Sequence, residues 1–410
     1  MEEKSFEAKL LHTPYAKEDA YKALQMPVYN TAAFEFDTAE AMEDAFVGRS
    51  PEHTYSRITN PTVQYFEDRV KTITGAIGVT ALNSGMAAIS NALIALAYSG
   101  ANIVTSKHLF GNTYSLMKST LADFGVETRF CDLTNLEEVR ATLDQNTCAV
   151  FLEVITNPQL EVADLKGLSL ITTEAGVPLV ADTTVVPFNA FKAKDFGVNI
   201  EVVSSTKYIS GGATTLGGLI LDYGTFNWAN SHKLKGLHSQ FGPFAFTSKM
   251  RKEIHRNFGA YMTPQTAYMQ TLGLDTLQLR FERAACTCLE LAKQLQDVPG
   301  IESVNYTGLE SSKFFEISTK QFGKYPGAML TFDLASREAC FAFMNRLELI
   351  KRATNLFDNK SLAIHPASTI FGTFTEDIRQ SMDVSQKTIR LSVGLEDVDD
   401  LLKDMKQALS

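Results

Sequence analysis

The chain has 410 residues, a formal net charge of -9 and 45% hydrophobic residues, which is the composition of an ordinary globular protein. Its Lys and Arg residues are scattered, so the sequence offers no basic face for nucleic acid. The acidic N-terminal stretch lacks the features of a secretory signal, and no apolar run reaches the roughly 18 residues of a membrane span. We therefore expect a cytoplasmic protein of more than one domain that binds neither nucleic acid nor a membrane.

The five cysteines predict neither a disulfide framework nor a metal site. They are odd in number and lie mostly in apolar contexts, which favours burial in the core. Cys286 and Cys288 form a C-x-C pair inside a helical pattern, where the two side chains point to different faces. We expect no bound metal.

Residues 1–60 contain many turn residues and little periodicity, which is typical of an arm or lid. Within residues 61–250, short β-branched apolar runs alternate with longer amphipathic runs. The apolar runs that predict strands lie at 102–106, 148–154, 177–182 and 199–205. Strands that alternate with helices at this spacing indicate βαβ units and a mostly parallel sheet flanked by helices.

Residues 251–410 have a different pattern. A long helical run over residues 263–300 ends in Pro-Gly, and strand patterns at 328–334 and 388–394 enclose a helical pattern at 336–348. This order favours a smaller α+β domain. The expected fold class is therefore α/β, with a mostly parallel sheet in the larger domain and a smaller α+β C-terminal domain.

Polar residues that directly follow apolar runs are the first candidates for a site, because ligands of open parallel sheets bind outside the carboxyl ends of the strands. At Asn-Ser-Gly (83–85), backbone N–H groups of a helix start could bind an anion, although Ser84 could instead merely cap the helix. Asp182 ends an apolar strand, where a carboxylate must be paired or hydrated. A helix or turn cap is its alternative role.

Lys207 lies in SSTKYISGG, after an apolar strand and among small residues. The order of these residues does not match a phosphate loop, and no G-x-G-x-x-G follows a strand, so a nucleotide site is disfavoured. Desolvation lowers the pKa of a lysine from about 10.4 towards neutrality, and the neutral amine can form a Schiff base. If its partner is pyridoxal 5'-phosphate (PLP), the helix start at Gly85 binds the phosphate and Asp182 keeps the pyridine nitrogen protonated.

Motifs spread along nearly the whole chain resemble those of the Cys/Met metabolism PLP enzymes. This family includes cystathionine γ-synthase, cystathionine γ-lyase, methionine γ-lyase and O-acetylhomoserine sulfhydrylase. The motifs are TYSRITNPT (54–62), NSGMAAI (83–89), LFGNTYSLM (109–117), EVITNPQLEVADL (153–165), VADTTVVPF (180–188), SSTKYISGG (204–212), LGLDTLQLRFER (272–283), LAIHPAST (362–369) and IRLSVGLED (389–397). The resemblance implies fold type I of the PLP-dependent transferases.

The resemblance also implies roles for single residues. Lys207 is the expected catalytic residue, which holds the cofactor and moves protons. Arg390 is expected to bind the substrate α-carboxylate as a bidentate fork, with help from Asn355. The expected cofactor contacts are Tyr55 and Arg57 from a neighbouring subunit, Gly85, Met86, Ser204 and Thr206 at the phosphate, Asp182 at the pyridine nitrogen, Asn157 near the phenolic oxygen and Phe110 on the ring. At least a homodimer, and a homotetramer of two such dimers, is implied.

Departures from the family pattern favour one reaction. Phe110 stands where tyrosine is usual and has no hydroxyl to protonate a leaving group, which fits acetate better than thiolate. Asn112 stands where methionine γ-lyases have cysteine, and residues 355–369 resemble O-acetylhomoserine sulfhydrylases. Phe357 and Val203 replace an expected glycine and histidine, and these changes bear on the substrate pocket.

We therefore expect γ-replacement of O-acetyl-L-homoserine with sulfide or methanethiol, which gives L-homocysteine or methionine and acetate. Methionine or cystathionine γ-lyase and cystathionine γ-synthase are the alternatives within the family. An alternative of another class is a non-catalytic regulatory protein that keeps the fold. The presence of Lys207, Asp182 and Arg390 argues against that last alternative.

Overall fold

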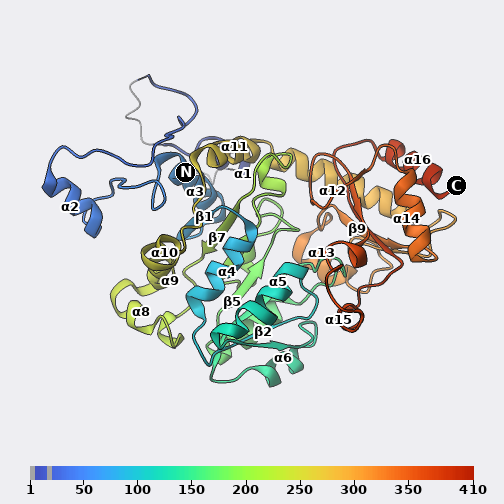
Figure 1. Cartoon of the computed structure of the whole chain (residues 1–410), viewed down its shortest axis with the longest axis horizontal. Coiled ribbons are helices and arrows are strands. Elements are labelled where there is room, and N and C mark those ends of the chain that lie inside the picture. Colours follow the sequence, from blue (N-terminus) through green and yellow to red (C-terminus); the bar gives the residue numbers. More distant parts are fainter. Residues whose placement is uncertain (1–4, 16–20) are drawn as a thin grey trace.

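The computed structural model describes residues 5–15 and 21–410, and its body is built around two sheets (Figure 1). The larger sheet has the strand order β1-β7-β6-β5-β4-β2-β3. Its strands are β1 (Gly78–Leu82), β2 (Asn102–Thr105), β3 (Glu127–Phe130), β4 (Thr147–Glu153), β5 (Leu179–Asp182), β6 (Ile200–Val203) and β7 (Gly218–Asp222). Only β7 runs antiparallel to its neighbours, so the sheet is mostly parallel as predicted.

The four strand ranges expected from the sequence coincide with β2, β4, β5 and β6 to within a few residues. These strands are buried on both faces, which explains why they read as apolar runs rather than as alternating patterns. Along β4, Phe151 packs into the core on one face while Val150 and Leu152 pack into the core on the other. Successive side chains of a strand thus point to opposite faces of the sheet, and this determines which side chains at the strand ends lie on the same face.

Helices cover both faces of this sheet. Helix α4 packs against β1, β6 and β7, whereas α3 packs against β1 and α7 against β5. Up to residue 258 the helices are α1 (Phe6–Leu11), α2 (Ala39–Val47), α3 (Pro61–Thr74), α4 (Gly85–Leu96), α5 (Gly111–Ser115), α6 (Leu136–Thr142), α7 (Leu165–Ala175), α8 (Lys235–Phe241), α9 (Ala245–Lys249) and α10 (Arg256–Phe258). This layered arrangement is the predicted α/β architecture.

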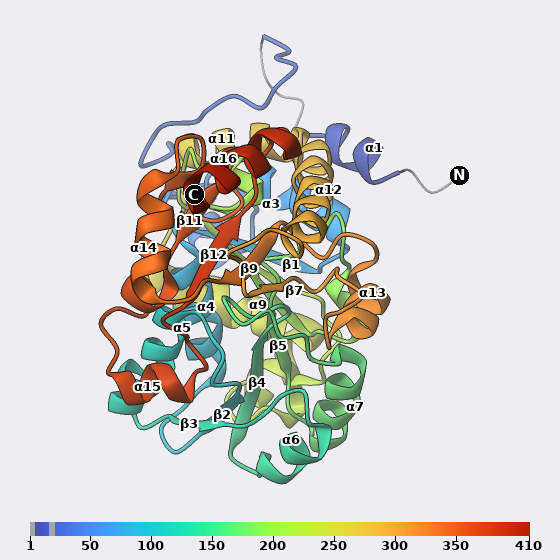
Figure 2. The same cartoon turned by 90° about the vertical axis from the view of Figure 1, so that its right-hand side faces the viewer.

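The second sheet has the order β10-β11-β12-β9-β8 and is mainly antiparallel. Helices α12, α14 and α16 pack on it and on one another (Figure 2). Its strands are β8 (Ser303–Asn305), β9 (Met329–Asp333), β10 (Lys351–Arg352), β11 (Leu362–Ile364) and β12 (Thr388–Ser392). The later helices are α11 (Pro264–Asp275), α12 (Leu277–Leu295), α13 (Phe315–Phe322), α14 (Arg337–Arg346), α15 (Glu376–Ser381) and α16 (Val398–Leu409).

The helical run expected over residues 263–300 is divided in two. Helix α11 ends at Asp275, and α12 begins at Leu277 after Thr276 leaves the helical backbone conformation. Asp and Thr are poor residues for a helix interior because their short polar side chains compete for backbone groups. Helix α11 packs against α3 of the larger unit. The predicted boundary at residue 250 remains a prediction.

The described part of the N-terminal range extends from the body and carries α2 at a distance from both sheets (Figure 1). It is tied down where Thr62 Oγ1 accepts from the Tyr29 backbone N–H at 2.9 Å. Many of its large apolar side chains are exposed, including Met42, Phe46 and Tyr55. In residues 5–15 and 21–410, no helix has the length and hydropathy needed to cross a bilayer.

Candidate active site

A cavity of 640 Å³ lies at the carboxyl ends of β4, β5 and β6, where the parallel strands deliver their terminal side chains. Every predicted site residue except Tyr55 and Arg57 lines it. Those that do are Gly85, Met86, Phe110, Asn157, Asp182, Ser204, Thr206, Lys207, Asn355 and Arg390. The fold therefore brings together residues that are up to three hundred positions apart in the sequence.

Lys207 follows β6 and is nearly buried. Its Nζ donates a hydrogen bond to Asn355 Oδ1 at 2.7 Å. Burial, helped by the nearby Arg390 charge and opposed by Asp182, lowers the pKa of Lys207 to about 8. The neutral amine needed for a Schiff base is therefore accessible near neutral pH.

Asp182 ends β5, and its Oδ1 accepts a hydrogen bond from the Thr184 backbone N–H at 2.9 Å. Burial raises the pKa of Asp182, while the bonds from Thr184 and the charge of Lys207 lower it. Asp182 therefore also caps the turn that follows β5, which is the alternative role expected from the sequence. A cationic ligand at this carboxylate would offset the cost of burying its charge.

The start of α4 forms one wall of the cavity. Ser84 caps the helix by accepting from the Ala87 N–H at 3.1 Å, as the simpler interpretation expects, and this cap leaves the anion site a prediction. A Cβ added at Gly85 would lie 2.6 Å from Ser204 Cβ, so only glycine allows this close approach. Free N–H groups at the first turn of a helix suit a phosphate. The hydroxyl of Thr206 is already bonded to Gly217 O at 3.2 Å.

Arg390 lines the cavity from β12 of the second sheet, and it is 1% exposed. Its Nη1 donates to Asn157 Oδ1 and its Nη2 to Asn355 O, both at 3.2 Å. Its Nε has no partner within the described part of the chain. Burial lowers the pKa of Arg390 to about 9, and an anionic ligand would stabilise the charged guanidinium.

Phe357 and Val203, where the sequence departs from the family pattern, do not line the cavity. Val203 is buried in the core, and the Phe357 ring stacks on Tyr208 with centroids 4.3 Å apart. Phe357 has a φ of +54°, a left-handed conformation that favours glycine. These two replacements therefore do not shape the pocket directly.

Several residues of the cavity escaped the sequence-based reasoning. Glu153 lines it from the end of β4, and its position after an apolar run is the same signal that singled out Asp182. Leu216, Leu356 and Ile370 form apolar parts of its wall. Leu356 directly follows Asn355 in the tract 355–369, so its position beside a predicted site residue could have marked it. Leu216 and Ile370 lie outside the quoted motifs, and no signal in the sequence marked them.

Tyr55 and Arg57 lie outside the cavity. The Arg57 guanidinium is 5.4 Å from the centre of the Tyr55 ring, and its Nη1 donates to Arg256 O at 2.6 Å. Tyr55 is 41% exposed. The prediction that both serve a neighbouring subunit remains a prediction.

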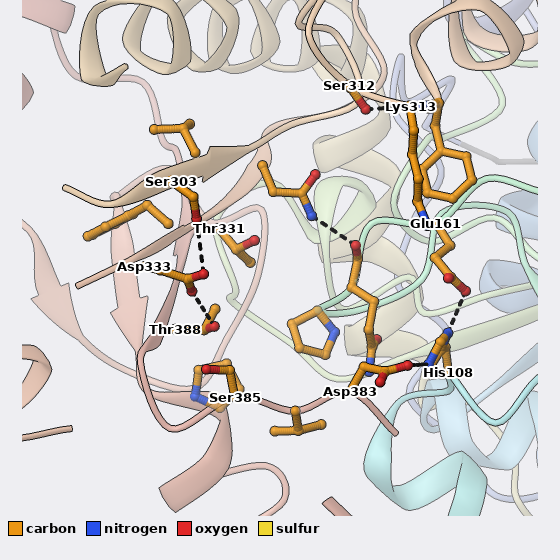
Figure 3. Close-up of a pocket in the computed structure, with 18 of the residues that line it drawn as sticks. His108, Glu161, Ser303, Ser312, Lys313, Thr331, Asp333, Asp383, Ser385 and Thr388 are labelled. Carbon is orange, nitrogen blue, oxygen red and sulfur yellow. Dashed lines mark hydrogen bonds and ion pairs between the residues drawn. The ribbon is translucent and has the colours of Figure 1, made fainter. Parts of the chain in front are cut away.

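A second cavity, of 590 Å³, contains a histidine held by two carboxylates (Figure 3). His108 Nδ1 lies 2.5 Å from Glu161 Oε2, and Nε2 lies 2.7 Å from Asp383 Oδ2. Burial lowers the pKa of His108, but hydrogen bonds and charges of the two carboxylates outweigh it, so the net shift is upward. Lys107 also faces Asp383, at 3.5 Å. The His108 side chain therefore links the loop that precedes Phe110 to the segment around Asp383.

The family model of Cys/Met metabolism PLP-dependent enzymes matches residues 7–410. The chain belongs to this family. Its cofactor is therefore pyridoxal 5'-phosphate, and the chain is an enzyme of the PLP-dependent class.

Relatives and solved structures agree with this assignment. O-acetyl-L-homoserine sulfhydrylase 1 of Thermus thermophilus is 36% identical, over 99% of this chain and 100% of the relative. The O-acetylhomoserine sulfhydrylase structure from Wolinella succinogenes is 45% identical with a TM-score of 0.78, and the match covers 87% of this chain and 99% of that one. A putative O-acetylhomoserine (thiol)-lyase from Campylobacter jejuni is 32% identical with a TM-score of 0.92, covering 98% and 99%. These likenesses confirm the predicted fold type.

The residues of the cavity fit the cofactor. A buried lysine with a lowered pKa suits the aldehyde, and the first turn of α4 suits the phosphate. The buried Asp182 carboxylate suits a protonated pyridine nitrogen. The Campylobacter structure contains N'-pyridoxyl-lysine-5'-monophosphate, a lysine joined to the cofactor.

The His108 bridge predicts a pH-dependent contribution to stability. Since the folded state raises the pKa of His108, the contribution is complete below the unfolded value of about 6.5 and is lost as pH rises through the folded value. We expect His108→Gln to lower the free energy of unfolding by about 1–2 kcal/mol near pH 6. Thermal melts near pH 6 and near pH 9 would measure the difference.

Asp383→Asn is the matched variant, because it removes one partner and leaves the imidazole in place. It should show the same trend with a smaller loss, since Asp383 is partly exposed to solvent. Equal losses for His108→Gln at both pH values would contradict a charged bridge.

Proposed function

We propose that the enzyme performs γ-replacement on O-acetyl-L-homoserine, with sulfide or methanethiol as the nucleophile. The products are L-homocysteine or methionine, and acetate, which is a step of methionine biosynthesis. The observation that supports this most is one cavity that holds Lys207, Asp182 and Arg390 beside the apolar ring of Phe110. The sulfhydrylase names of relatives matched over nearly the whole chain support the same reaction.

Arg390 is proposed to orient the substrate. Its unpartnered Nε and its Nη groups can bind the α-carboxylate as a fork, and lysine could not supply this geometry. Asn355 contacts both Arg390, through its backbone oxygen, and Lys207, through its side chain. A carboxylate bound at Arg390 therefore directs the amino-acid end of the substrate towards Lys207.

When bound, the cofactor supplies an electron sink for negative charge that develops on the substrate carbons. The neutral Nζ of Lys207 takes the proton from Cα, and removal of a second proton, from Cβ, then allows acetate to leave Cγ. The thiol sulfur forms its bond at Cγ and gives up its proton, which balances the released acetate. One proton then returns to Cβ, and Lys207 returns the other to Cα. Asp182 remains ionised and keeps the pyridine nitrogen protonated.

The leaving group distinguishes this reaction from elimination of a thiolate. Phe110 offers no proton to a departing atom, and Leu216 and Ile370, which line the same cavity, are also apolar. Acetate is a weaker base than a thiolate and needs less protonation to leave. The wall of the cavity thus favours an acylated homoserine as substrate.

We further propose that the enzyme is at least a homodimer, built into a homotetramer, and that it acts in the cytoplasm. Residues 1–60 form an arm for the neighbouring subunit, residues 61–250 the PLP-binding domain and residues 251–410 the C-terminal domain. The exposed position of Tyr55, outside its own cavity, supports a role for the arm in another subunit.

The cofactor link to Lys207 can be tested by spectroscopy. The purified protein should show a visible absorption band of the lysine-bound cofactor, and Lys207→Ala should abolish it because no amine remains to bind the aldehyde. The exposed Lys192 provides a control, since Lys192→Ala should keep the band. A wild-type protein that shows no such band after incubation with PLP would argue against the proposed site.

The reaction can be tested by product analysis. With O-acetylhomoserine and sulfide, the enzyme should form homocysteine faster than it releases 2-oxobutyrate from methionine or cystathionine. Phe110→Tyr should raise the rate of 2-oxobutyrate release, because a hydroxyl is restored beside the leaving group. Faster 2-oxobutyrate release by the wild-type enzyme would instead identify a γ-lyase.

Sharing of a site between subunits can be tested by mixing variants. Arg57→Ala and Lys207→Ala should each be strongly impaired, but their mixed dimers contain one site with both native residues. Random exchange should therefore restore about a quarter of wild-type activity. A mixture of Asp182→Asn with Lys207→Ala serves as control and should restore none, since both residues belong to one cavity. No recovery in the first mixture would place Arg57 in its own subunit's site.

A further inference from the structure

Glu153 is a second carboxyl group in the cavity, and none of the expected roles includes it. It is the last residue of β4 and is 8% exposed. It lies in register with Asp182 on the adjacent parallel strand β5. Side chains in register on neighbouring strands share a face of the sheet and lie about 5 Å apart at Cβ. Both carboxyl groups therefore line the same wall.

The two oxygens of Glu153 bind two different loops. Oε1 accepts from the backbone N–H of Phe110 at 2.6 Å, and Oε2 accepts from the backbone N–H of Asn157 at 3.2 Å. Phe110 lies after β2 and directly before α5, and Asn157 follows β4. One side chain thus fixes the backbone of two residues that face the cavity from separate strands.

Two neighbouring buried carboxyl groups are not readily charged at the same time, because the charge of each disfavours ionisation of the other. Burial raises the pKa of Glu153 to about 8, and the charge of Asp182 adds to this rise. At Asp182 the bonds from Thr184 and the charge of Lys207 oppose the effect of burial. Near neutral pH Glu153 is therefore mainly neutral, whereas a pyridinium beside Asp182 would favour the charged form of that carboxylate.

We propose that Glu153 is a positioning residue, which holds Phe110 and Asn157 in place against the cofactor. The inference rests on the proposed placement of the cofactor in this cavity. It assigns Glu153 no contact with the reacting atoms. Its effect passes through the ring of Phe110 and the amide of Asn157.

The neighbouring strand provides a matched comparison. Glu201 on β6 is equally buried and is bonded to Thr183 and Tyr223. It is in register with Ala181 rather than with Asp182, so it points to the opposite face and does not line the cavity. Burial raises the pKa of Glu201 to about 7. Glu201 also feels the charge of Asp182, but its bonds go to Thr183 and Tyr223. Glu201→Gln therefore reports the loss of a buried carboxyl group without loss of the bonds to Phe110 and Asn157.

The experiment compares Glu153→Leu and Glu153→Gln with Glu201→Gln. Each variant is stripped of cofactor and titrated with PLP, and the circular dichroism of the bound cofactor is recorded in the visible range. Glu153→Leu loses both acceptors, so PLP should bind about tenfold or more weakly, with an altered dichroic band. Glu153→Gln keeps only one acceptor oxygen and should show a smaller loss of the same kind.

Glu201→Gln should lower the melting temperature and leave both cofactor readouts at wild-type values. Wild-type affinity and dichroism in Glu153→Leu would overturn the inference, as would equal changes in Glu201→Gln. If Glu153→Leu does not fold, Glu153→Gln decides: weaker binding than in Glu201→Gln supports the inference, and equal binding overturns it. A wild-type protein that binds no PLP would overturn the cofactor placement itself.

Discussion

The arrangement of the active site depends on the burial of charge at the carboxyl ends of β4, β5 and β6. Three ionisable side chains are buried there: Lys207, Asp182 and Arg390. Burial disfavours the charged form of each, so it lowers the pKa of Lys207 and Arg390 and raises that of Asp182. Isolated buried charges are costly, so such a cluster persists only if the surrounding fold stabilises it. A cofactor with a cationic nitrogen and a substrate with an anionic carboxylate complement Asp182 and Arg390. Ligands of opposite charge therefore offset the free-energy cost of burying these two groups.

The two sheets have different tasks in meeting this constraint. The parallel sheet supplies Asp182 and the backbone around Lys207, held rigid by cores on both of its faces. The antiparallel sheet supplies Arg390, whose Nη1 reaches Asn157 of the larger unit. The proposed cofactor and substrate contacts thus come from separate sheets that meet at one cavity. Asp182 ends β5 and Arg390 lies within β12, so both side chains are carried by strands.

Much of this site was accessible from the sequence, for a physical reason. Lys207 and Asp182 follow apolar strands, and the carboxyl ends of parallel strands must meet at one edge of a sheet. The same reasoning applied to CAVFLEV would have added Glu153, which was overlooked. Ile370 enters the cavity from a segment without a strand or motif, so only tertiary packing places it there.

Other features depended on context that no local pattern contains. Thr276 interrupts a helical run that periodicity alone would continue. Phe357 seemed to bear on substrate choice because of its position in a motif, yet its ring packs on Tyr208. The conformation of its backbone, with φ at +54°, could not be read from the sequence.

That packing of Phe357 on Tyr208 has a mechanical consequence. Tyr208 directly follows Lys207, and its hydroxyl also accepts a hydrogen bond from the Ala328 N–H, beside β9, at 3.0 Å. Tyr208 is therefore held by two contacts with the C-terminal part of the chain, the ring of Phe357 and the N–H of Ala328. A hinge motion of this part away from the larger sheet would have to break these contacts or move Lys207 as well. These two contacts therefore tie the position of Lys207 to the C-terminal part of the chain.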